Sequence, residues 1–190
     1  MINIIGGKNK RTKLLVPKKD VRPTSSLKRE AIFSTLESHA VKNSYNLYKD
    51  KCFIDLFAGS GAMGLEAVSR GAKNCFFYEN NINVLDILEK NCNKICNDNN
   101  FQIINEDINN GNIYQTNIPI SVIFIDPPYK IVKFDNILEK IKNLSDFNYL
   151  SLIVIESHKD TILDNVNEYK VIIEKIFNKT KISFLQLYSN

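Results

Sequence analysis

The sequence predicts an α/β fold, with a seven-stranded, mostly parallel sheet that ends in a C-terminal antiparallel hairpin. From residue 51 onward, short apolar stretches typical of buried strands alternate with helical patterns, which favours parallel strands joined by crossover helices. A glycine-rich turn, residues 59–64, joins the first of these strands to the first helix. Only residues 178–181 separate the last two expected strands. Such a connection is too short for a crossover and predicts an antiparallel pair.

Length and composition predict one domain with a sizeable core. The chain has 190 residues, of which 44% are hydrophobic. No apolar run approaches the roughly 20 residues of a membrane span, and the apolar part of residues 1–7 is too short for a signal peptide. We therefore expect a cytoplasmic protein without membrane contact, and a monomer. Its four cysteines are expected to be reduced thiols, and no metal site is expected. Cys92 and Cys96 have a spacing that could ligand a metal, but no histidine lies near them in the sequence.

Basic residues are concentrated near the N-terminus. Residues 1–30 hold nine basic and two acidic side chains, whereas the rest of the chain carries a net charge of −3. A basic arm on a slightly acidic body favours a polyanionic partner that meets one end of the molecule. We therefore divide the chain into residues 1–45, a basic arm and helix that contact the partner, and residues 46–190, the main domain.

The N-terminal segment is expected to form a hairpin followed by a helix. Residues 2–5 and 14–16 are apolar and flank Gly6 and Gly7, with the basic residues near the tip. After the loop at residues 22–24, Thr24 or Ser25 can cap the helix. Leu27 and later apolar residues form its expected buried stripe, and Arg29 lies on the other side. A polar linker, residues 41–50, follows.

The main domain is expected to alternate strands and helices. The clearest helix has an apolar stripe of Leu85, Leu88, Cys92 and Ile95. The expected helices are 62–70, 82–97 and 134–143. The expected strands are 51–56, 74–78, 101–105, 121–125, 150–156, 169–177 and 182–188.

Residues 59–64, Gly-Ser-Gly-Ala-Met-Gly, match the dinucleotide-binding pattern G-x-G-x-x-G. Gly59 and Gly61 permit positive φ and let a ligand approach the backbone. Glu79 ends the second strand and could bind ribose hydroxyls, in NAD or in S-adenosylmethionine. Asp55 ends the first strand, where a carboxylate would repel a pyrophosphate but attract a cationic amino group and sulfonium. Glu79 and Asp55 together favour S-adenosylmethionine over NAD as the cofactor. An NAD-dependent dehydrogenase is a distant alternative.

The tetrapeptide Asp126-Pro127-Pro128-Tyr129 follows the apolar fourth strand and should face the same crevice as the glycine turn. Asp126 and the Pro127 carbonyl could accept both hydrogens of an exocyclic base amine, which would favour a nucleophilic nitrogen. The two prolines fix the loop, and Tyr129 could stack on the base for about 1–3 kcal/mol. The simpler alternative is that Asp126 caps a helix and the prolines end a strand. Asp107 ends the third strand and could bond an adenine amine, or it is a surface aspartate.

Further short segments accompany these motifs: 4–7, 13–14, 22–24, 29–33, 65–67, 69–72, 155–156, 180 and 183–184. Together they resemble class I S-adenosylmethionine-dependent methyltransferases, which have a Rossmann-like fold. More closely they resemble the RsmD family, bacterial enzymes that methylate a guanine N2 in small-subunit (16S) ribosomal RNA. The N-terminal pair of motifs, 4–7 with 13–14 and 22–24 with 29–33, is the specific part of the likeness. Arg11 and Asn178 depart from it, because the family usually has glycine at both places.

The resemblance implies a role for each candidate residue. The base would be held by Asp126, Pro127, Pro128 and Tyr129. The cofactor would be held by Asp55, Phe57, Ala58, Gly59, Ser60, Gly61, Glu79, Asn80, Asp107 and Ile108. RNA would be bound near the entrance by Lys10, Arg11, Lys13, Arg22, Thr24 and Arg29.

The sequence thus predicts a ribosomal RNA guanine-N2 methyltransferase that uses S-adenosylmethionine and acts on an assembled or assembling small ribosomal subunit. A DNA adenine-N6 methyltransferase could use the same tetrapeptide and chemistry, but no inserted segment is long enough for a DNA-reading domain. An RNA-binding protein with an inactive methyltransferase fold would be expected to lose the glycine turn or the tetrapeptide, and both are present.

Overall fold

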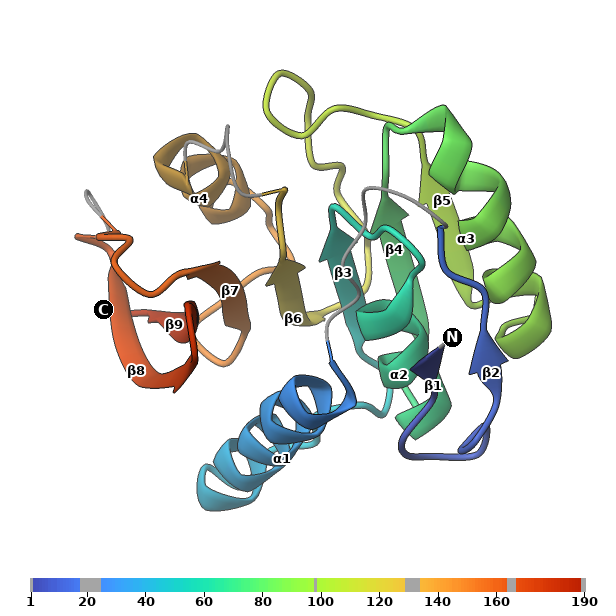
Figure 1. Cartoon of the computed structure of the whole chain (residues 1–190). Coiled ribbons are helices and arrows are strands. Elements are labelled where there is room, and N and C mark those ends of the chain that lie inside the picture. The colour runs from blue at the N-terminus through green and yellow to red at the C-terminus, as the bar shows by residue number, and fades with distance from the viewer. Residues whose placement is uncertain (1, 18–24, 98, 129–133, 164–166, 189–190) are drawn as a thin grey trace.

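A seven-stranded sheet with the strand order β5-β4-β3-β6-β7-β9-β8 forms the centre of the molecule. Figure 1 shows the computed structural model, which describes residues 2–17, 25–97, 99–128, 134–163 and 167–188. Neighbouring strands from β5 to β7 run parallel, whereas β9 pairs antiparallel with both β7 and β8. The predicted α/β sheet with a C-terminal antiparallel hairpin is confirmed. The strands are β3 (Cys52–Leu56), β4 (Asn74–Tyr78), β5 (Phe101–Ile104), β6 (Ile120–Ile125), β7 (Leu152–His158), β8 (Tyr169–Phe177) and β9 (Thr180–Leu187).

The C-terminal hairpin turns in two residues rather than the expected four. β9 begins at Thr180, because Thr180 and Lys181 already pair with Phe177 and Ile176 of β8. On its other side, β9 pairs with Ser157 and His158, so β7 also extends two residues beyond its predicted end. Asn178 has φ 55° and takes the left-handed turn position at which the family usually has glycine.

The helices lie on both faces of the sheet. Buried side chains of α1 (Ser26–Lys42), α2 (Ala62–Arg70) and α3 (Ile82–Ile95) share a core with one face, whereas α4 (Phe134–Lys142) packs with the other. Sheet residues alternate between the two cores: Phe53 and Phe124 face the three helices, and Ile54 and Ile125 face α4. None of the described helices is long and apolar enough to cross a membrane.

The predicted N-terminal hairpin is present as β1 (Ile2–Asn3) and β2 (Lys13–Leu14), and it packs on the domain core. Ile4 and Leu14 are buried in the same core as the three helices. The connection between β1 and β2 lies against the C-terminal end of α2, where the Lys8 amide donates to the Ser69 carbonyl at 2.8 Å. Gly7 has φ 73°, and a Cβ at this position would clash with that carbonyl. The arm is therefore joined to the main domain by close backbone packing.

Two expectations for α1 are wrong. Arg29, expected on the polar side, is fully buried, and its guanidinium donates to the Asn3 carbonyl at 2.6 Å. Leu27, expected on the buried stripe, is 70% exposed. The helix faces its arm as well as the sheet, and the arm's backbone supplies acceptors for a buried cation. Glu66 of α2 is also fully buried nearby and accepts the amides of Ile5 and Gly6 at 2.8 and 2.7 Å.

Candidate functional site

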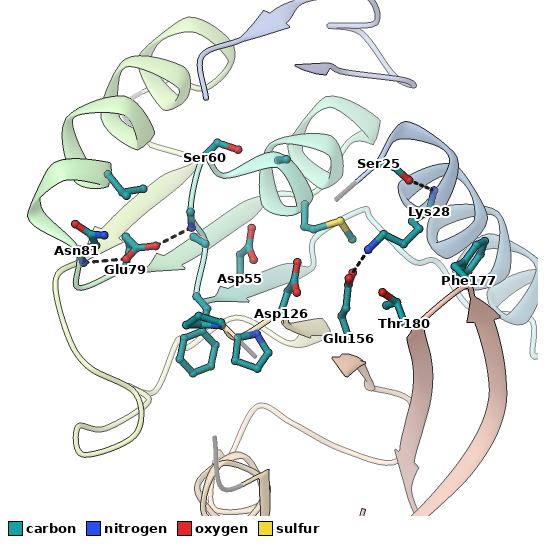
Figure 2. Close-up of a pocket in the computed structure, with 18 of the residues that line it drawn as sticks. Ser25, Lys28, Asp55, Ser60, Glu79, Asn81, Asp126, Glu156, Phe177 and Thr180 are labelled. Atoms are coloured by element: carbon teal, nitrogen blue, oxygen red, sulfur yellow. Dashed lines mark hydrogen bonds and ion pairs between the residues drawn. The ribbon is translucent and has the colours of Figure 1, made fainter. Parts of the chain in front are cut away.

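A cleft of about 1360 Å³ lies at the carboxyl ends of β3, β4, β6 and β7. The strand order reverses between β3 and β6, and ligands of open α/β sheets bind at such a switch point. The first turn of α1 and the β8–β9 turn form the far side of the cleft (Figure 2). Typical small-molecule pockets measure about 300–1,000 Å³, so the volume accommodates more than one small ligand.

The turn between β3 and α2 has the backbone conformation that its glycines predict. Gly59 and Gly61 have φ values of 55° and 78°. Phe57 also has a positive φ, 63°, and lines the cleft; for a bulky side chain this conformation costs about 1–3 kcal/mol. Ala58, Gly59 and Ser60 line the cleft as predicted. Phe57 thus holds a strained turn at the point where the backbone faces a ligand.

Gly61, by contrast, faces the core. It is not among the residues that line the cleft, and a Cβ there would lie 2.6 Å from Leu88 Cδ1 of α3. Gly64 is similar, because its Cβ would clash with the Phe77 ring. The structure therefore corrects the expectation of direct ligand contact by Gly61: these two glycines allow α2 to pack closely on α3 and β4.

Asp55 is a buried carboxyl group at the floor of the cleft. It is 2% exposed, and its Oδ2 accepts the Gly64 amide at 2.9 Å. Burial raises the pKa of Asp55 to about 8; the Gly64 bond opposes this rise, and the nearby carboxylates of Asp126 and Glu79 add to it. A cationic ligand would favour the ionised form, as the sequence predicts for this position.

Glu79 lies at the end of β4 and contacts the glycine turn. Its Oε2 accepts the Gly59 amide and its Oε1 accepts the Asn81 amide, both at 2.8 Å. These bonds fix the carboxylate at the edge of the cleft, and Asn80, the next residue, also lines the cleft. A carboxylate oxygen accepts more than one hydrogen bond, so the orientation suits ribose hydroxyls as donors.

The segment after β6 enters the middle of the cleft. Asp126 is half-buried, Pro127 is buried and Pro128 is exposed, and all three line the cleft. Figure 2 shows the Asp126 carboxylate between Asp55 and Glu156. Tyr129, the fourth residue of the predicted motif, lies outside the described residues. The glycine turn and the first three residues of the tetrapeptide, about 70 residues apart in sequence, thus meet in one cleft as predicted.

Asp107 and Ile108 do not line the cleft, contrary to expectation. Asp107 Oδ1 accepts the Asn109 amide at 3.0 Å, and Oδ2 accepts the Asn110 side chain at 3.0 Å. Ile108 is buried in the core on the α4 side of the sheet. Both side chains therefore have partners outside the cleft: Asp107 in a local aspartate turn after the edge strand β5, and Ile108 in the core.

The described residues that are expected to bind RNA have two different environments. Lys10, Arg11 and Lys13 are exposed on the arm. The arm's turn packs at the end of α2, a nine-residue helix about 13 Å long that begins at the glycine turn. The turn between β1 and β2, which holds Lys10 and Arg11, therefore lies at the opposite edge of the sheet from the cleft, not at its entrance (Figure 1). Arg29 is buried and is unavailable to RNA. Arg22 and Thr24 lie outside the described residues.

Motif analysis assigned no role in the site to several residues that line it. Lys28 of α1 forms an ion pair with Glu156 at the end of β7, and Phe177 and Thr180 come from the β8–β9 hairpin. Lys28 is part of a basic run, and Glu156 appeared only in the family resemblance, so neither showed a local signal. Among the described residues, no group of three or more histidine, cysteine, aspartate or glutamate side chains is placed to hold a metal ion.

Comparisons with known proteins agree with this architecture. The family model described as "Conserved hypothetical protein 95" matches residues 2–186. "Ribosomal RNA small subunit methyltransferase D" of Haemophilus influenzae is 31% identical over 195 residues, which cover 100% of this chain and 94% of that protein. The protein of the same name from Escherichia coli K12 is 34% identical over 169 residues, covering 87% of this chain and 79% of the relative.

Solved structures show the same fold. The Escherichia coli protein yhhF superposes with a TM-score of 0.76 at 27% identity, over 100% of this chain and 99% of that one. The HI0767 protein of Haemophilus influenzae gives a TM-score of 0.76 at 25% identity, over 99% of both chains. With its Rossmann-like class I methyltransferase fold and full-length match, the chain belongs to the conserved hypothetical protein 95 family, the RsmD family of methyltransferases.

Proposed function

We propose that this protein transfers a methyl group from S-adenosylmethionine to the exocyclic N2 amine of a guanine in small-subunit (16S) ribosomal RNA. One observation carries the proposal: Asp126 and Pro127 share a single cleft with buried Asp55 and the glycine turn. The cleft volume of about 1360 Å³ leaves room for a base beside a cofactor.

The cofactor half of the cleft extends from Glu79 to Asp55. S-adenosylmethionine would supply the activated methyl group and leave as S-adenosylhomocysteine, and the methylated amine would release one proton to solvent. Glu79 suits the ribose hydroxyls, and Asp55 suits the cationic end of the molecule. The backbone of residues 58–60 lies in close reach of a ligand, with Gly59 in the left-handed conformation. These groups bind and orient the methyl donor.

The base half of the cleft extends from Asp126 toward α1 and the β8–β9 turn. The Asp126 carboxylate and the Pro127 carbonyl would accept the two amine hydrogens, which orients the nitrogen lone pair toward the methyl group. The acceleration would come from positioning and electrostatics, not from a strong base. A base buried in this cleft must first leave its stack. The proposed stacking role of Tyr129 rests on the sequence.

Ribosomal RNA is proposed as the substrate because the relatives over 30% identical are named small-subunit ribosomal RNA methyltransferases. The exposed cations Lys10, Arg11 and Lys13 would contact RNA away from the cleft, which suits a large substrate such as a small ribosomal subunit. In this proposal the protein acts as a cytoplasmic monomer, and Arg22 and Thr24 keep their predicted RNA contacts.

The decisive test supplies tritiated S-adenosylmethionine and small ribosomal subunits from a strain that lacks the enzyme, followed by nucleoside analysis. Label in N2-methylguanosine is expected. Label in another nucleoside would overturn the base assignment, and label only in duplex DNA, as N6-methyladenine, would favour a DNA methyltransferase. No label in either substrate would favour an RNA-binding protein with an inactive fold.

Variants of two aspartates test the proposed role of the tetrapeptide. Asp126→Ala should abolish turnover and leave the Kd for S-adenosylmethionine within a few-fold. Asp86→Ala is the matched control, because Asp86 is exposed on α3, where it pairs with Lys90. Unchanged turnover in Asp126→Ala would contradict the assignment.

A further inference from the structure

Asp126 and Glu156 occupy equivalent positions on neighbouring parallel strands. Ile125 of β6 is in register with Ile155 of β7, so the residues that follow them lie at the same level, with the strands about 4.8 Å apart. Both side chains line the main cleft, and both also line a small hollow that adjoins it. Two carboxylates therefore lie side by side at the base end of the cleft (Figure 2).

Lys28 supplies a cation beyond the second carboxylate. Its Nζ forms an ion pair with Glu156 Oε1, with side chains 16% and 7% exposed. The position of Lys28 is fixed by the start of α1, where the Ser25 hydroxyl accepts the Lys28 amide at 3.3 Å. In Figure 2, Asp126, Glu156 and Lys28 follow one another away from the cofactor half. Their charges run negative, negative, positive.

This order matches the Watson–Crick edge of guanine, which presents the N2 amine, the N1–H donor and the O6 acceptor in sequence. Resting on the proposed function, we propose that Glu156 accepts guanine N1–H and that Lys28 donates to O6, while Asp126 holds N2. An ammonium has three hydrogens and a carboxylate oxygen accepts more than one bond, so the ion pair can persist with the base present. Glu156 and Lys28 are then the specificity-determining residues of the site.

The same pair would reject other bases. Adenine placed with its amine at Asp126 presents the unprotonated N1 to Glu156, acceptor against acceptor, and offers Lys28 only a C–H. A well-placed pair of hydrogen bonds is worth about 1–3 kcal/mol of discrimination between bases. The ion pair thus provides a physical basis for a preference for guanine over adenine at a tetrapeptide that suits both amines.

The test measures base recognition separately from methyl transfer. The full-length protein with S-adenosylhomocysteine is titrated, by NMR, with guanosine, adenosine and 2-aminopurine riboside 5′-monophosphates. 2-Aminopurine keeps the amine but lacks N1–H and O6. The wild-type protein should bind the guanine nucleotide roughly tenfold more tightly than the other two. Equal affinities would overturn the proposal, whatever the protein methylates.

Variants of Lys28 and Glu156 distinguish a role of this ion pair in guanine recognition from a purely structural role. Lys28→Met and Glu156→Met each remove one of the two proposed contacts and should reduce the preference for the guanine nucleotide over 2-aminopurine severalfold. The exchanged pair Lys28→Glu with Glu156→Lys restores an α1–β7 ion pair but reverses donor and acceptor, so the thermal midpoint should recover and the guanine preference should not. Recovery of the preference would show that the pair is structural, which overturns the proposal.

Controls distinguish this proposal from the proposed function. Lys90→Met removes a lysine from the exposed Lys90–Asp86 ion pair and should leave the preference unchanged. If ribosomal subunits take up no label but the two variants reduce a guanine preference, the ribosomal function is refuted and the recognition is supported. Labelled subunits without any preference would support the function and overturn the recognition by Lys28 and Glu156.

Discussion

The side-chain amide of Asn91 donates a 2.9 Å hydrogen bond to the carbonyl oxygen of Ser60 in the glycine turn. The same side chain also binds the arm: its Nδ2 donates to the Leu15 carbonyl at 2.9 Å, and its Oδ1 accepts the Leu15 amide at 2.8 Å. Asn91 is fully buried in α3. A single side chain therefore links the end of the arm's second strand to the turn that lines the cleft.

We expect Asn91→Leu to weaken both stability and cofactor binding. Leucine has a similar size but leaves three backbone groups without their partner: the part-buried amide and carbonyl of Leu15 and the buried Ser60 carbonyl. An unpaired buried group costs about 1–3 kcal/mol. The free energy of unfolding should fall by several kcal/mol, and the Kd for S-adenosylmethionine should rise because the Ser60 backbone is no longer held. Urea unfolding and calorimetric titration measure the two effects. Asn93→Leu, exposed on the same helix, is the control. An unchanged Kd in a folded Asn91→Leu protein would contradict the link.

Asp55→Asn should stabilise the ligand-free protein while weakening cofactor binding. The pKa of about 8 in the folded state exceeds the ordinary value of 3.8, so the folded protein holds a proton that the unfolded chain releases. Stability therefore falls as pH rises from about 4 to about 8. Asparagine can still accept the Gly64 amide and carries no charge. The gain in thermal midpoint should be small at pH 4 and largest above pH 8.

The same substitution tests what the carboxylate does for the ligand. A cationic ligand favours ionised Asp55, so wild-type affinity for S-adenosylmethionine should rise with pH up to about 8. At pH 8 the variant should bind about tenfold to hundredfold more weakly, the worth of a hydrogen bond to a charged group. The ligand's amino group titrates in both proteins, so the ratio of the two Kd values isolates Asp55. If the ratio of the two Kd values did not change with pH, Asp55 would not be the group that binds the cationic end of the ligand.

The strands, the helices and most of the cleft could be predicted because their signals are local. The glycines of residues 59–64 predict a turn, and Asp126 directly follows an apolar strand. Asn91 and Glu66 could not be predicted in the same way: each is a buried polar residue whose partners lie about 60–76 positions away in the arm. Asn91 interrupts no pattern, since it lies beside the apolar stripe of α3.

The two errors on α1 have one cause. Helical periodicity assumes a single buried face, but α1 contacts both the sheet and the arm. Arg29 therefore lies inside with Asn3 as its acceptor, and Leu27 lies at the cleft. The charge distribution of the sequence likewise predicts that the arm is basic, but it cannot predict how far these cations lie from the cleft. That distance depends on how Gly7 packs on α2.

Substitution of Lys10, Arg11 and Lys13 by alanine should weaken RNA binding. Loss of three phosphate contacts would lower the slope of log K against log salt by about 2–3. Because Lys10 and Arg11 lie at the edge of the sheet opposite the cleft, the loss should appear in KM for RNA rather than in kcat. Alanine at Lys90, Lys170 and Lys175 removes the same charge from α3 and β8 and is the control. An identical salt slope in both triple variants would mean that only net charge matters.

Arg11 gives a test of backbone strain that is independent of its charge. Its φ is 73°, and its amide donates to the Ile4 carbonyl at 2.9 Å within the arm's turn. A left-handed conformation costs a non-glycine residue about 1–2 kcal/mol, and glycine's larger unfolded-state entropy returns roughly 0.5–1 kcal/mol of that. Arg11→Gly should therefore be more stable than Arg11→Ala by about 0.5–1 kcal/mol, although both lose the same charge. Equal urea midpoints and slopes would mean that the arm unfolds without destabilising the core, despite the burial of Ile4 and Leu14.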